Sequence, residues 1–353
     1  MNDDAVNLPS HAQVDRRERS APPAFAAIDL GTNNCRLLMA TPAGEGFRVL
    51  DSFSRMVRLG EGLHETGRLS ELAMDRAIAA LQGCAGRLSR RPLRAVRAIA
   101  TEACRQATNG AEFLARARLE TGLNIDIIST REEAELALES CTPLLRSGGR
   151  RALLFDIGGG STELAWVRLP DSGAAEPQLI GTISLPVGVV TLGERYGPAG
   201  QTAEGFQAMV ADVAARLRAF EGVHCIGHEI RLGGVRFLGT SGTVTTLAGI
   251  VLNLPRYNRL AVDGVVLSHA DTDAALARLQ ALGRDGLDQH PCIGPDRAAF
   301  VLPGCAIFAA IHRTWPAPEI VVADRGLREG MLLRMIRADR ATSFRRRRTD
   351  PPL

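Results

Sequence analysis

Two glycine-rich segments of the sequence share one layout and could bind phosphate. Each is an apolar run that ends in aspartate, followed by glycine and small hydroxyl or amide residues: Asp29-Leu30-Gly31-Thr32-Asn33-Asn34 and Asp156-Ile157-Gly158-Gly159-Gly160-Ser161. Glycines lack a Cβ, so the backbone can take positive φ and point several N–H groups at one anion. An aspartate at the strand end suits Mg²⁺, which takes one or two carboxylates and keeps several waters. A plain glycine turn explains one such loop equally well, but two matching loops favour a phosphate site.

A third glycine-rich segment runs from an expected strand into an expected helix near 241–253. It reads Gly239-Thr240-Ser241-Gly242-Thr243. A helix N-terminus offers unpaired backbone N–H groups and a partial positive charge, which attract phosphate. An ordinary N-cap by Ser241 or Thr243 explains the segment equally well, so both interpretations stay open.

Two glutamates and one arginine are candidates for the chemistry itself. Glu133 could be the general base that takes a proton from an attacking water, as hydrolysis of a phosphoanhydride requires. The order Thr130-Arg131-Glu132-Glu133 also fits a capping box with Thr130 as N-cap, and the residues alone favour that interpretation. Glu163 could orient water or a metal, or it could face solvent. Arg105 could bind phosphate through two hydrogen bonds, although an exposed surface position is commoner.

The composition excludes several kinds of site. The sequence contains no lysine, so all 42 basic residues are arginine, and there is no P-loop lysine or Schiff base. Phosphate chemistry must therefore rest on arginine, backbone N–H groups and metal ions. There is no His-x-x-x-His pair and no Gly-x-Ser-x-Gly segment, so zinc and serine hydrolases have no support. With a net charge of +3 and 4% aromatic residues, we expect no nucleic-acid partner.

Cysteines and hydropathy indicate the compartment. The seven cysteines are an odd number, widely spread, with no Cys-x-x-Cys pair, so neither disulfides nor a cysteine zinc site are expected. No apolar stretch approaches the roughly 18 residues of a membrane-spanning helix, and the N-terminus lacks the pattern of a signal peptide. We expect a cytoplasmic protein without a membrane partner.

The elements that must position these residues follow from hydrophobic periodicity. Short apolar runs bounded by glycine alternate with amphipathic helical patterns, which predicts an α/β fold. Strands are expected at 25–30, 36–40, 95–100 and 164–167. Helices are expected from Ser70 and near 111–121, 131–146, 203–220, 241–253, 268–282, 296–314 and 326–340. Asp29 and Asp156 lie 156 − 29 = 127 positions apart, so two duplicated halves facing each other would bring both loops to one cleft.

The expected domain organisation follows the same patterns. Residues 1–23 are predicted to be a disordered leader, and residues 341–353, with Arg345 to Arg348, a basic disordered tail. Domain I spans 24–140, with the first loop and Glu133. Domain II spans 141–340, with the other glycine-rich loops, and the last helix, about 326–340, has the option of packing back on domain I.

Together these motifs resemble the exopolyphosphatase and guanosine pentaphosphate phosphatase family, within the actin, Hsp70 and sugar-kinase superfamily. The resemblance runs from about Phe25 to Arg337. It rests on separate segments, which read AAIDLGTN (26–33), ATEACRQA (100–107), IISTREEAE (127–135), FDIGGGSTEL (155–164), GTSGT (239–243) and DRGLREG (324–330).

The resemblance implies two ribonuclease-H-like domains with a cleft between them. It also implies that Glu133 is the catalytic glutamate, that Asp156 and Glu163 serve metal and water, and that the glycine loops hold phosphates. Two features depart from the family pattern. Glu135 stands where many members have arginine, which removes a positive charge near the base. The chain also ends too early for the extra C-terminal helical domain of longer members, so we expect the short two-domain form.

We therefore expect an exopolyphosphatase that releases terminal phosphate by in-line attack of a water activated by Glu133, with help from Glu163. Mg²⁺ or Mn²⁺ is expected at Asp29, Asp156 and Glu163. The expected phosphate-binding residues are Gly31, Thr32, Asn33, Asn34, Arg105, Gly158, Gly159, Gly160, Ser161, Gly239, Thr240, Ser241, Gly242 and Thr243.

Three alternatives to polyphosphate hydrolysis stay open. They are a guanosine pentaphosphate phosphohydrolase, a non-catalytic sensor of polyphosphate or alarmone, and an actin-like sugar or acetate kinase. Polyphosphate is preferred because the chain has only two Trp and two Tyr, none of them in the phosphate motifs, to bind a base. The oligomeric state also stays open, a homodimer included.

Overall fold

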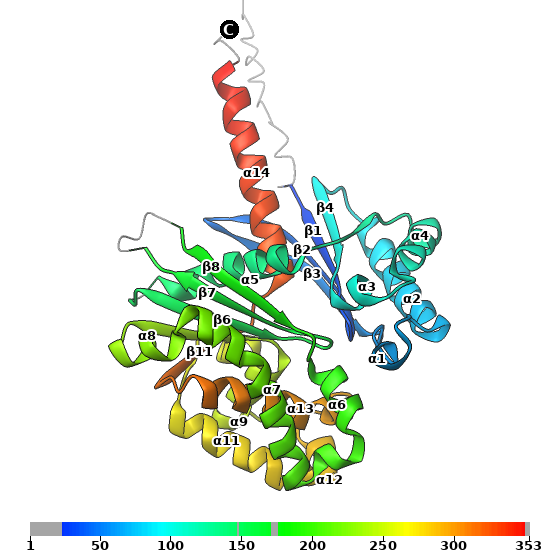
Figure 1. Ribbon diagram of the computed structural model, residues 1–353. Coiled ribbons are helices and arrows are strands. Elements are labelled where there is room, and N and C mark those ends of the chain that lie inside the picture. The colour runs from blue at the N-terminus through cyan, green and yellow to red at the C-terminus, as the bar shows by residue number, and fades with distance from the viewer. Residues whose placement is uncertain (1–22, 147, 171–175, 350–353) are drawn as a thin grey trace, which may run out of the picture.

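The computed structural model describes residues 23–146, 148–170 and 176–349 of the chain. Its elements form two α/β halves, each built on one mixed sheet (Figure 1). The elements of the first half are β1 (Phe25–Leu30), β2 (Asn34–Ala43), β3 (Gly46–Met56), α1 (Leu63–Thr66), α2 (Glu71–Leu88), β4 (Ala95–Ala100), α3 (Glu102–Gln106), α4 (Gly110–Thr121), β5 (Ile125–Ile127) and α5 (Thr130–Leu145). Those of the second half are β6 (Arg151–Ile157), β7 (Thr162–Arg168), β8 (Gln178–Leu185), α6 (Val189–Tyr196), a 3₁₀ turn (Gly197–Gln201), α7 (Ala203–His224), α8 (Ile226–Leu232), β9 (Val235–Thr240), α9 (Gly242–Val251), α10 (Arg259–Val262), β10 (Val266–Ser268), α11 (His269–Ala281), α12 (Gly283–Gln289), α13 (Pro295–Thr314), β11 (Glu319–Ala323) and α14 (Leu327–Thr349).

The two sheets repeat one strand pattern. The first has the order β3-β2-β1-β4-β5, and the second has β8-β7-β6-β9-β11 with β10 added at its edge. In each half the first three strands pair antiparallel, and the next two run parallel to the first strand. This is the ribonuclease-H-like arrangement, so the expected α/β fold of two such domains is confirmed. Each of the first two glycine loops is the turn of a hairpin.

Strand β1 is buried on both faces because its alternating side chains enter two different cores. Ile28 and Leu30 pack with residues of α2 and α4. Phe25 and Ala27 point the other way and pack with residues of α14. Successive side chains of a strand point to opposite faces, and a strand covered on both sides is apolar throughout. The first loop therefore leaves the end of a firmly packed strand.

Helices α5 and α14 lie between the two sheets (Figure 1). Helix α5 packs Cys141 against the second sheet, while its Leu136 joins Met331 of α14 in the core of the first sheet. Gly330 permits this approach, since a Cβ there would lie 2.1 Å from the carbonyl oxygen of Leu136. The expected boundary between 140 and 141 falls inside α5, because this helix belongs to the cores of both halves. Helix α14 packs on β1 of the first half, so the last helix does pack back on domain I.

The C-terminal helix is longer than its pattern predicted. Helix α14 reaches Thr349, so the stretch expected to be disordered from 341 is helical as far as that residue. Residues 341–349 contain no glycine or proline and four arginines, which are good helix formers. Residues 350–353, and residues 1–22 of the expected leader, lie outside the described part. Within the described residues no helix is both long and apolar enough to cross a membrane.

Candidate active site

A cavity of about 670 Å³ lies between the two halves, and most of the expected site residues line it. The carboxylates Asp29, Glu133, Asp156 and Glu163 come to it from β1, α5, β6 and β7. Of the expected phosphate-binding residues, only Arg105 and Gly239 do not line it. The others, all of which do, are Gly31, Thr32, Asn33, Asn34, Gly158, Gly159, Gly160, Ser161, Thr240, Ser241, Gly242 and Thr243.

The first two glycine loops contact each other across the cavity. A Cβ on Gly160 would lie 2.6 Å from Thr32 Oγ1, and one on Gly159 would lie 3.1 Å from Asn33 Cβ. Gly31, Gly158, Gly159 and Gly160 do not adopt positive φ. The expectation that these glycines are needed for positive φ is therefore wrong. Gly159 and Gly160 are needed because the second loop approaches the first too closely there for a side chain.

The third loop begins with a glycine that packs in the core and continues into the polar start of helix α9. A Cβ on Gly239 would lie 2.6 Å from the Phe155 ring, so this glycine serves packing rather than ligand binding. Ser241 precedes α9 with a φ of 100°, and neither it nor Thr243 caps the helix through its side chain. Among the described residues, the buried Ser241 Oγ finds no hydrogen-bond partner. Ser241 is thus the N-cap residue by position, as one interpretation had it, but its side chain makes no capping hydrogen bond. A polar ligand in the cavity would satisfy this hydroxyl.

Glu133 is not part of a capping box. Helix α5 is capped by Ser129, whose Oγ accepts a hydrogen bond from the Glu132 amide at 3.2 Å. Thr130 thus lies inside the helix, and Glu133 is one position past the place that a capping box uses. Its side chain is buried instead, and its Oε2 accepts a hydrogen bond from Arg105 Nη1 at 2.8 Å. The interpretation that the residues alone favoured is wrong.

Arg105 holds Glu133 rather than facing the cavity. Its guanidinium also donates to Glu102 Oε2 at 2.7 Å and to the Ile128 carbonyl at 2.9 Å. Two carboxylates and a carbonyl therefore engage its donors. Its expected part in phosphate binding is not supported by this geometry, and we regard Arg105 as a positioning residue for Glu133. Glu135, the departure from the family pattern, pairs with Arg131 at 3.0 Å and does not line the cavity.

Burial raises the pKa of the four cavity carboxyls. In Glu133, burial and then the charge of Glu163 hold the pKa well above its ordinary value, against the opposing charge of Arg105. Burial raises the pKa of Glu163 to about 7, although Ser161 and Ser184 donate hydrogen bonds to its Oε1 at 2.5 and 2.8 Å.

The two aspartates at the strand ends show the same effect. Burial raises the pKa of Asp156 to about 6, opposed by Arg36. Burial also raises the pKa of Asp29, opposed first by Arg36 and then by Arg328. An additional cation near these groups would lower the energy of their charged forms.

The carboxylates of Asp29, Asp156 and Glu163 offer oxygen atoms of the kind that bind a hard divalent cation. Among the described residues, these three side chains do not form a group whose ligand atoms all lie within 4.8 Å of one another. The expectation of Mg²⁺ or Mn²⁺ at Asp29, Asp156 and Glu163 stays a prediction. Mg²⁺ bound by one or two of these carboxylates, with water completing its shell, fits the residues present.

Five arginines that were not among the expected site residues also line the cavity. They are Arg36 of β2, Arg259 of α10, Arg297 of α13, Arg325 before α14 and Arg328 of α14. Arg36 lies opposite Asp29 in the strand register, and the pKa of Arg328 is lowered by burial. The repeat could have indicated Arg36, because 163 − 127 = 36 places it at the position of Glu163 in the other hairpin. Arg325 and Arg328 belong to the segment DRGLREG (324–330), whereas no comparable signal in the sequence indicates Arg259 or Arg297.

The comparisons with known proteins agree with this fold. The model of the Ppx/GppA phosphatase family matches residues 39–339. A solved exopolyphosphatase-like protein is 28% identical with a TM-score of 0.79, and the match covers 89% of this chain and 97% of that one. The Ppx/GppA family member of Aquifex aeolicus is 27% identical with a TM-score of 0.74, covering 90% of this chain and 98% of that one. An exopolyphosphatase from Cytophaga hutchinsonii, 23% identical with a TM-score of 0.79 over 89% of this chain and 98% of its own, shares the fold. The chain belongs to the Ppx/GppA phosphatase family.

Proposed function

We propose that this protein hydrolyses the terminal phosphoanhydride bond of inorganic polyphosphate. The observation that carries the proposal is Glu133, a buried carboxylate on the cavity wall that Arg105 holds through Oε2. Its Oε1 accepts no hydrogen bond from the described residues, so this oxygen can take a proton from water. The raised pKa brings the basicity of Glu133 toward that of a base working near neutral pH.

Phosphate binding rests on the loops and on arginine. Backbone N–H groups of the two contacting loops and of the start of α9 would donate to phosphate oxygens. Arg36 and Arg328 would add positive charge in a protein without lysine. Mg²⁺ or Mn²⁺, held by Asp29 or Asp156, would offset the negative charge that develops on the phosphate oxygens. Glu163, fixed by Ser161 and Ser184, would orient the water beside Glu133.

Hydrolysis of guanosine pentaphosphate is the second candidate, and one observation favours it. Tyr257 and Phe300 both line the cavity, although they lie outside the glycine motifs. The Tyr257 hydroxyl donates to Asp324, and Arg297 lies at the same wall. Aromatic rings beside a carboxylate and an arginine are groups that can bind a base. This weakens the argument for polyphosphate that was based on the scarcity of aromatic residues.

A direct comparison of substrates tests the proposal. Released phosphate is measured with polyphosphate, guanosine pentaphosphate and ATP at one Mg²⁺ concentration and one ionic strength. We expect the highest kcat/KM for polyphosphate, and Tyr257→Ala should lower kcat/KM for guanosine pentaphosphate alone. A higher kcat/KM for guanosine pentaphosphate would reverse the preference. Tight binding without turnover of either compound would favour a sensor, and ATP consumption that depends on an added sugar or acetate would favour a kinase.

We infer a cytoplasmic location as part of the same proposal. All seven cysteines are unpaired in the structure, and all but Cys225 are buried. Unpaired cysteines are typical of a reducing compartment. Fractionation of cells that produce the protein would test this inference.

A further inference from the structure

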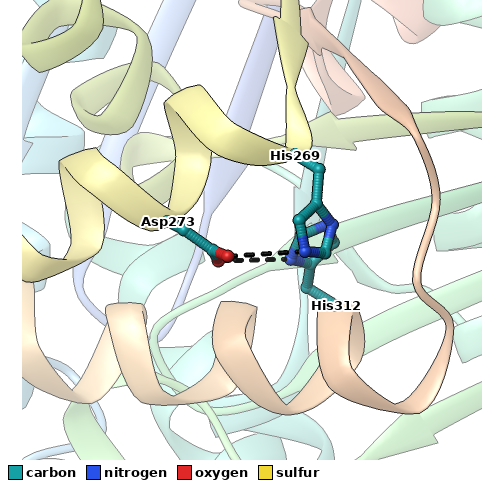
Figure 2. Close-up of side chains that lie close together, drawn as sticks. All are labelled: His269, Asp273 and His312. Carbon is teal, nitrogen blue, oxygen red and sulfur yellow. Dashed lines mark ion pairs between the residues drawn. The ribbon is translucent and has the colours of Figure 1, made fainter.

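Two histidines and an aspartate of the second half converge away from the cavity (Figure 2). His269 and Asp273 belong to α11, and His312 lies in the last turn of α13. One ligand atom from each side chain lies within 4.8 Å of the other two. None of the three lines the cavity between the halves, so this cluster is a separate feature.

The start of α11 fixes two of the three side chains. Ser268 caps this helix, its Oγ accepting from the Asp271 amide at 3.1 Å while its own amide donates to Asp271 Oδ2 at 3.3 Å. His269 is therefore the first residue of the helix, and Asp273 follows four positions later. Residues at this spacing lie on the same helix face. Both side chains point toward His312 on the neighbouring helix (Figure 2).

The separations between the side chains are too long for good hydrogen bonds and close to those around a metal ion. His269 Nε2 lies 3.4 Å from Asp273 Oδ2, and His312 Nδ1 lies 3.9 Å from Asp273 Oδ1. An N–H···O hydrogen bond measures about 2.7 to 3.2 Å. Two ligands of a tetrahedral ion with bonds of about 2.0 to 2.1 Å lie about 3.3 Å apart. The gap between these groups can therefore accept an ion with small adjustments of the side chains.

His312 supplies an independent observation. Its side chain is only 4% exposed, and its buried Nε2 has no hydrogen-bond partner among the described residues. The other ring nitrogen, Nδ1, faces Asp273 at a distance too long for a hydrogen bond, so the buried ring gains no direct hydrogen bond from the cluster. An unprotonated imidazole nitrogen is the group through which histidine ligates metals.

We propose that His269, Asp273 and His312 bind one divalent transition-metal cation, Zn²⁺ foremost, with water in the fourth position. Two imidazoles and a carboxylate suit zinc and its neighbours, whereas Mg²⁺ prefers an all-oxygen shell. The ion would join α11 to α13 and stabilise the folded protein by mass action. This proposal does not depend on the reaction catalysed in the cavity.

The test uses the full chain without an affinity tag, freed of metal and then kept in excess Mg²⁺ to occupy the cavity carboxylates. Zn²⁺ binding is followed by calorimetry and by the melting temperature. We expect one Zn²⁺ per chain that Asp273→Asn and His269→Ala each weaken at least ~10-fold, together with a rise in melting temperature that both variants lose. Co²⁺ should give the visible absorption of a tetrahedral complex in the wild type and not in these variants.

His228→Ala is the matched control, because His228 is an exposed histidine of the second half outside the cluster. It should keep the zinc site of the wild type. The two test positions are exposed, so neither variant should fail to fold. Equal stoichiometry and affinity of Zn²⁺ binding in the wild type and in Asp273→Asn would overturn the proposal. The proposal would also fail if the wild type took up no more zinc than the variants.

Discussion

The first hairpins of the two halves share a backbone arrangement and differ in charge. In β1–β2, Asp29 lies opposite Arg36, whereas in β6–β7, Asp156 lies opposite Glu163. Arg36 opposes the rise in pKa of both aspartates, while the charge of Asp156 adds to the rise in pKa of Glu163. The first hairpin, the basic side, thus pairs its aspartate with an arginine, whereas the second, the acidic side, pairs two carboxylates. The difference arises at one equivalent position of the two hairpins, which is Arg36 in the first and Glu163 in the second.

The glycines of the two hairpins differ in the same way. A Cβ on Gly31 would make an ordinary contact, 3.5 Å from the Asn34 carbonyl oxygen, whereas one on Gly160 would collide with Thr32. The second loop therefore inserts against the first. Substitutions in and around the two hairpins can test this difference in charge and in packing.

The largest effect is expected for Glu133→Gln. Glu133 comes from α5 of the first half, and the charge of Glu163 in the acidic hairpin helps to raise its pKa. The amide keeps the size of the side chain but cannot accept a proton from water, so kcat should fall by about 10² to 10⁴. KM for polyphosphate should change little, because Glu133 is not proposed to bind phosphate. Steady-state kinetics measure both values, and a kcat near that of the wild type would remove Glu133 as the base.

The insertion of the second loop predicts unequal effects at glycines of the two loops. Gly160→Ala should raise KM and lower kcat/KM by up to about 10², since displacing a loop by even 1 Å has effects of this size. Gly31→Ala should stay close to the wild type, because its Cβ meets no close atom. Kinetics and melting temperatures of both variants test the difference. Equal losses at the two positions would show that the loops are equivalent after all.

The basic side should affect binding more than turnover. Arg36→Met keeps much of the aliphatic length and removes the charge, so KM should rise about 10-fold, as expected for the loss of one charge-assisted hydrogen bond. The exposed Arg131→Met provides a control for loss of one positive charge. A drop in kcat with unchanged KM would contradict the role given to Arg36.

The smallest effect concerns stability and pH in metal-free protein. The pKa of Asp156 is about 6 in the folded protein, against 3.8 for an ordinary aspartate. Between pH 3.8 and about 6, the folded protein therefore holds a proton that the unfolded chain has released. Stability should therefore fall as pH rises from about 4 to 6 and stay lower above that range. Asp156→Asn should raise the free energy of unfolding at pH 8 by on the order of 2 kcal/mol and change it little at pH 4.

Denaturant unfolding in the presence of a chelator measures this effect. Asp29→Asn is the matched variant and should gain less, because Arg36 and Arg328 both support the charged form of Asp29. A larger gain at Asp29 would reverse the electrostatic difference between the hairpins.

Local patterns predicted the fold and the acidic framework of the site. The repeated strand–Asp–Gly layout gave both hairpins, because a strand ending in a glycine turn is encoded within about ten residues. The helix expected from Ser70 is α2, and Ser70 caps it, with its Oγ accepting from the Ala73 amide at 3.3 Å. The same local information placed Asp29 and Asp156 at corresponding positions of two sheets.

Features that depend on contacts between distant segments were not predictable in this way. Ser129 and Thr130 are both good caps, and the choice of Ser129 moves Glu133 out of the capping position. Arg105 is drawn away from the cavity by Glu133, which is 28 residues later in the chain. Tyr257 reaches the cavity from the segment between α9 and α10, where no local pattern marks it.

The passage of α5 and α14 between the halves has a mechanical consequence. These two helices belong to the cores that join the sheets, and they contact each other at Gly330 and Leu136. A rotation that widens the cavity would therefore turn about this crossing. Glu133 stands at the start of α5, one turn before Leu136, so the base lies near this crossing. We expect the base to keep its place against α14 when substrate enters and leaves.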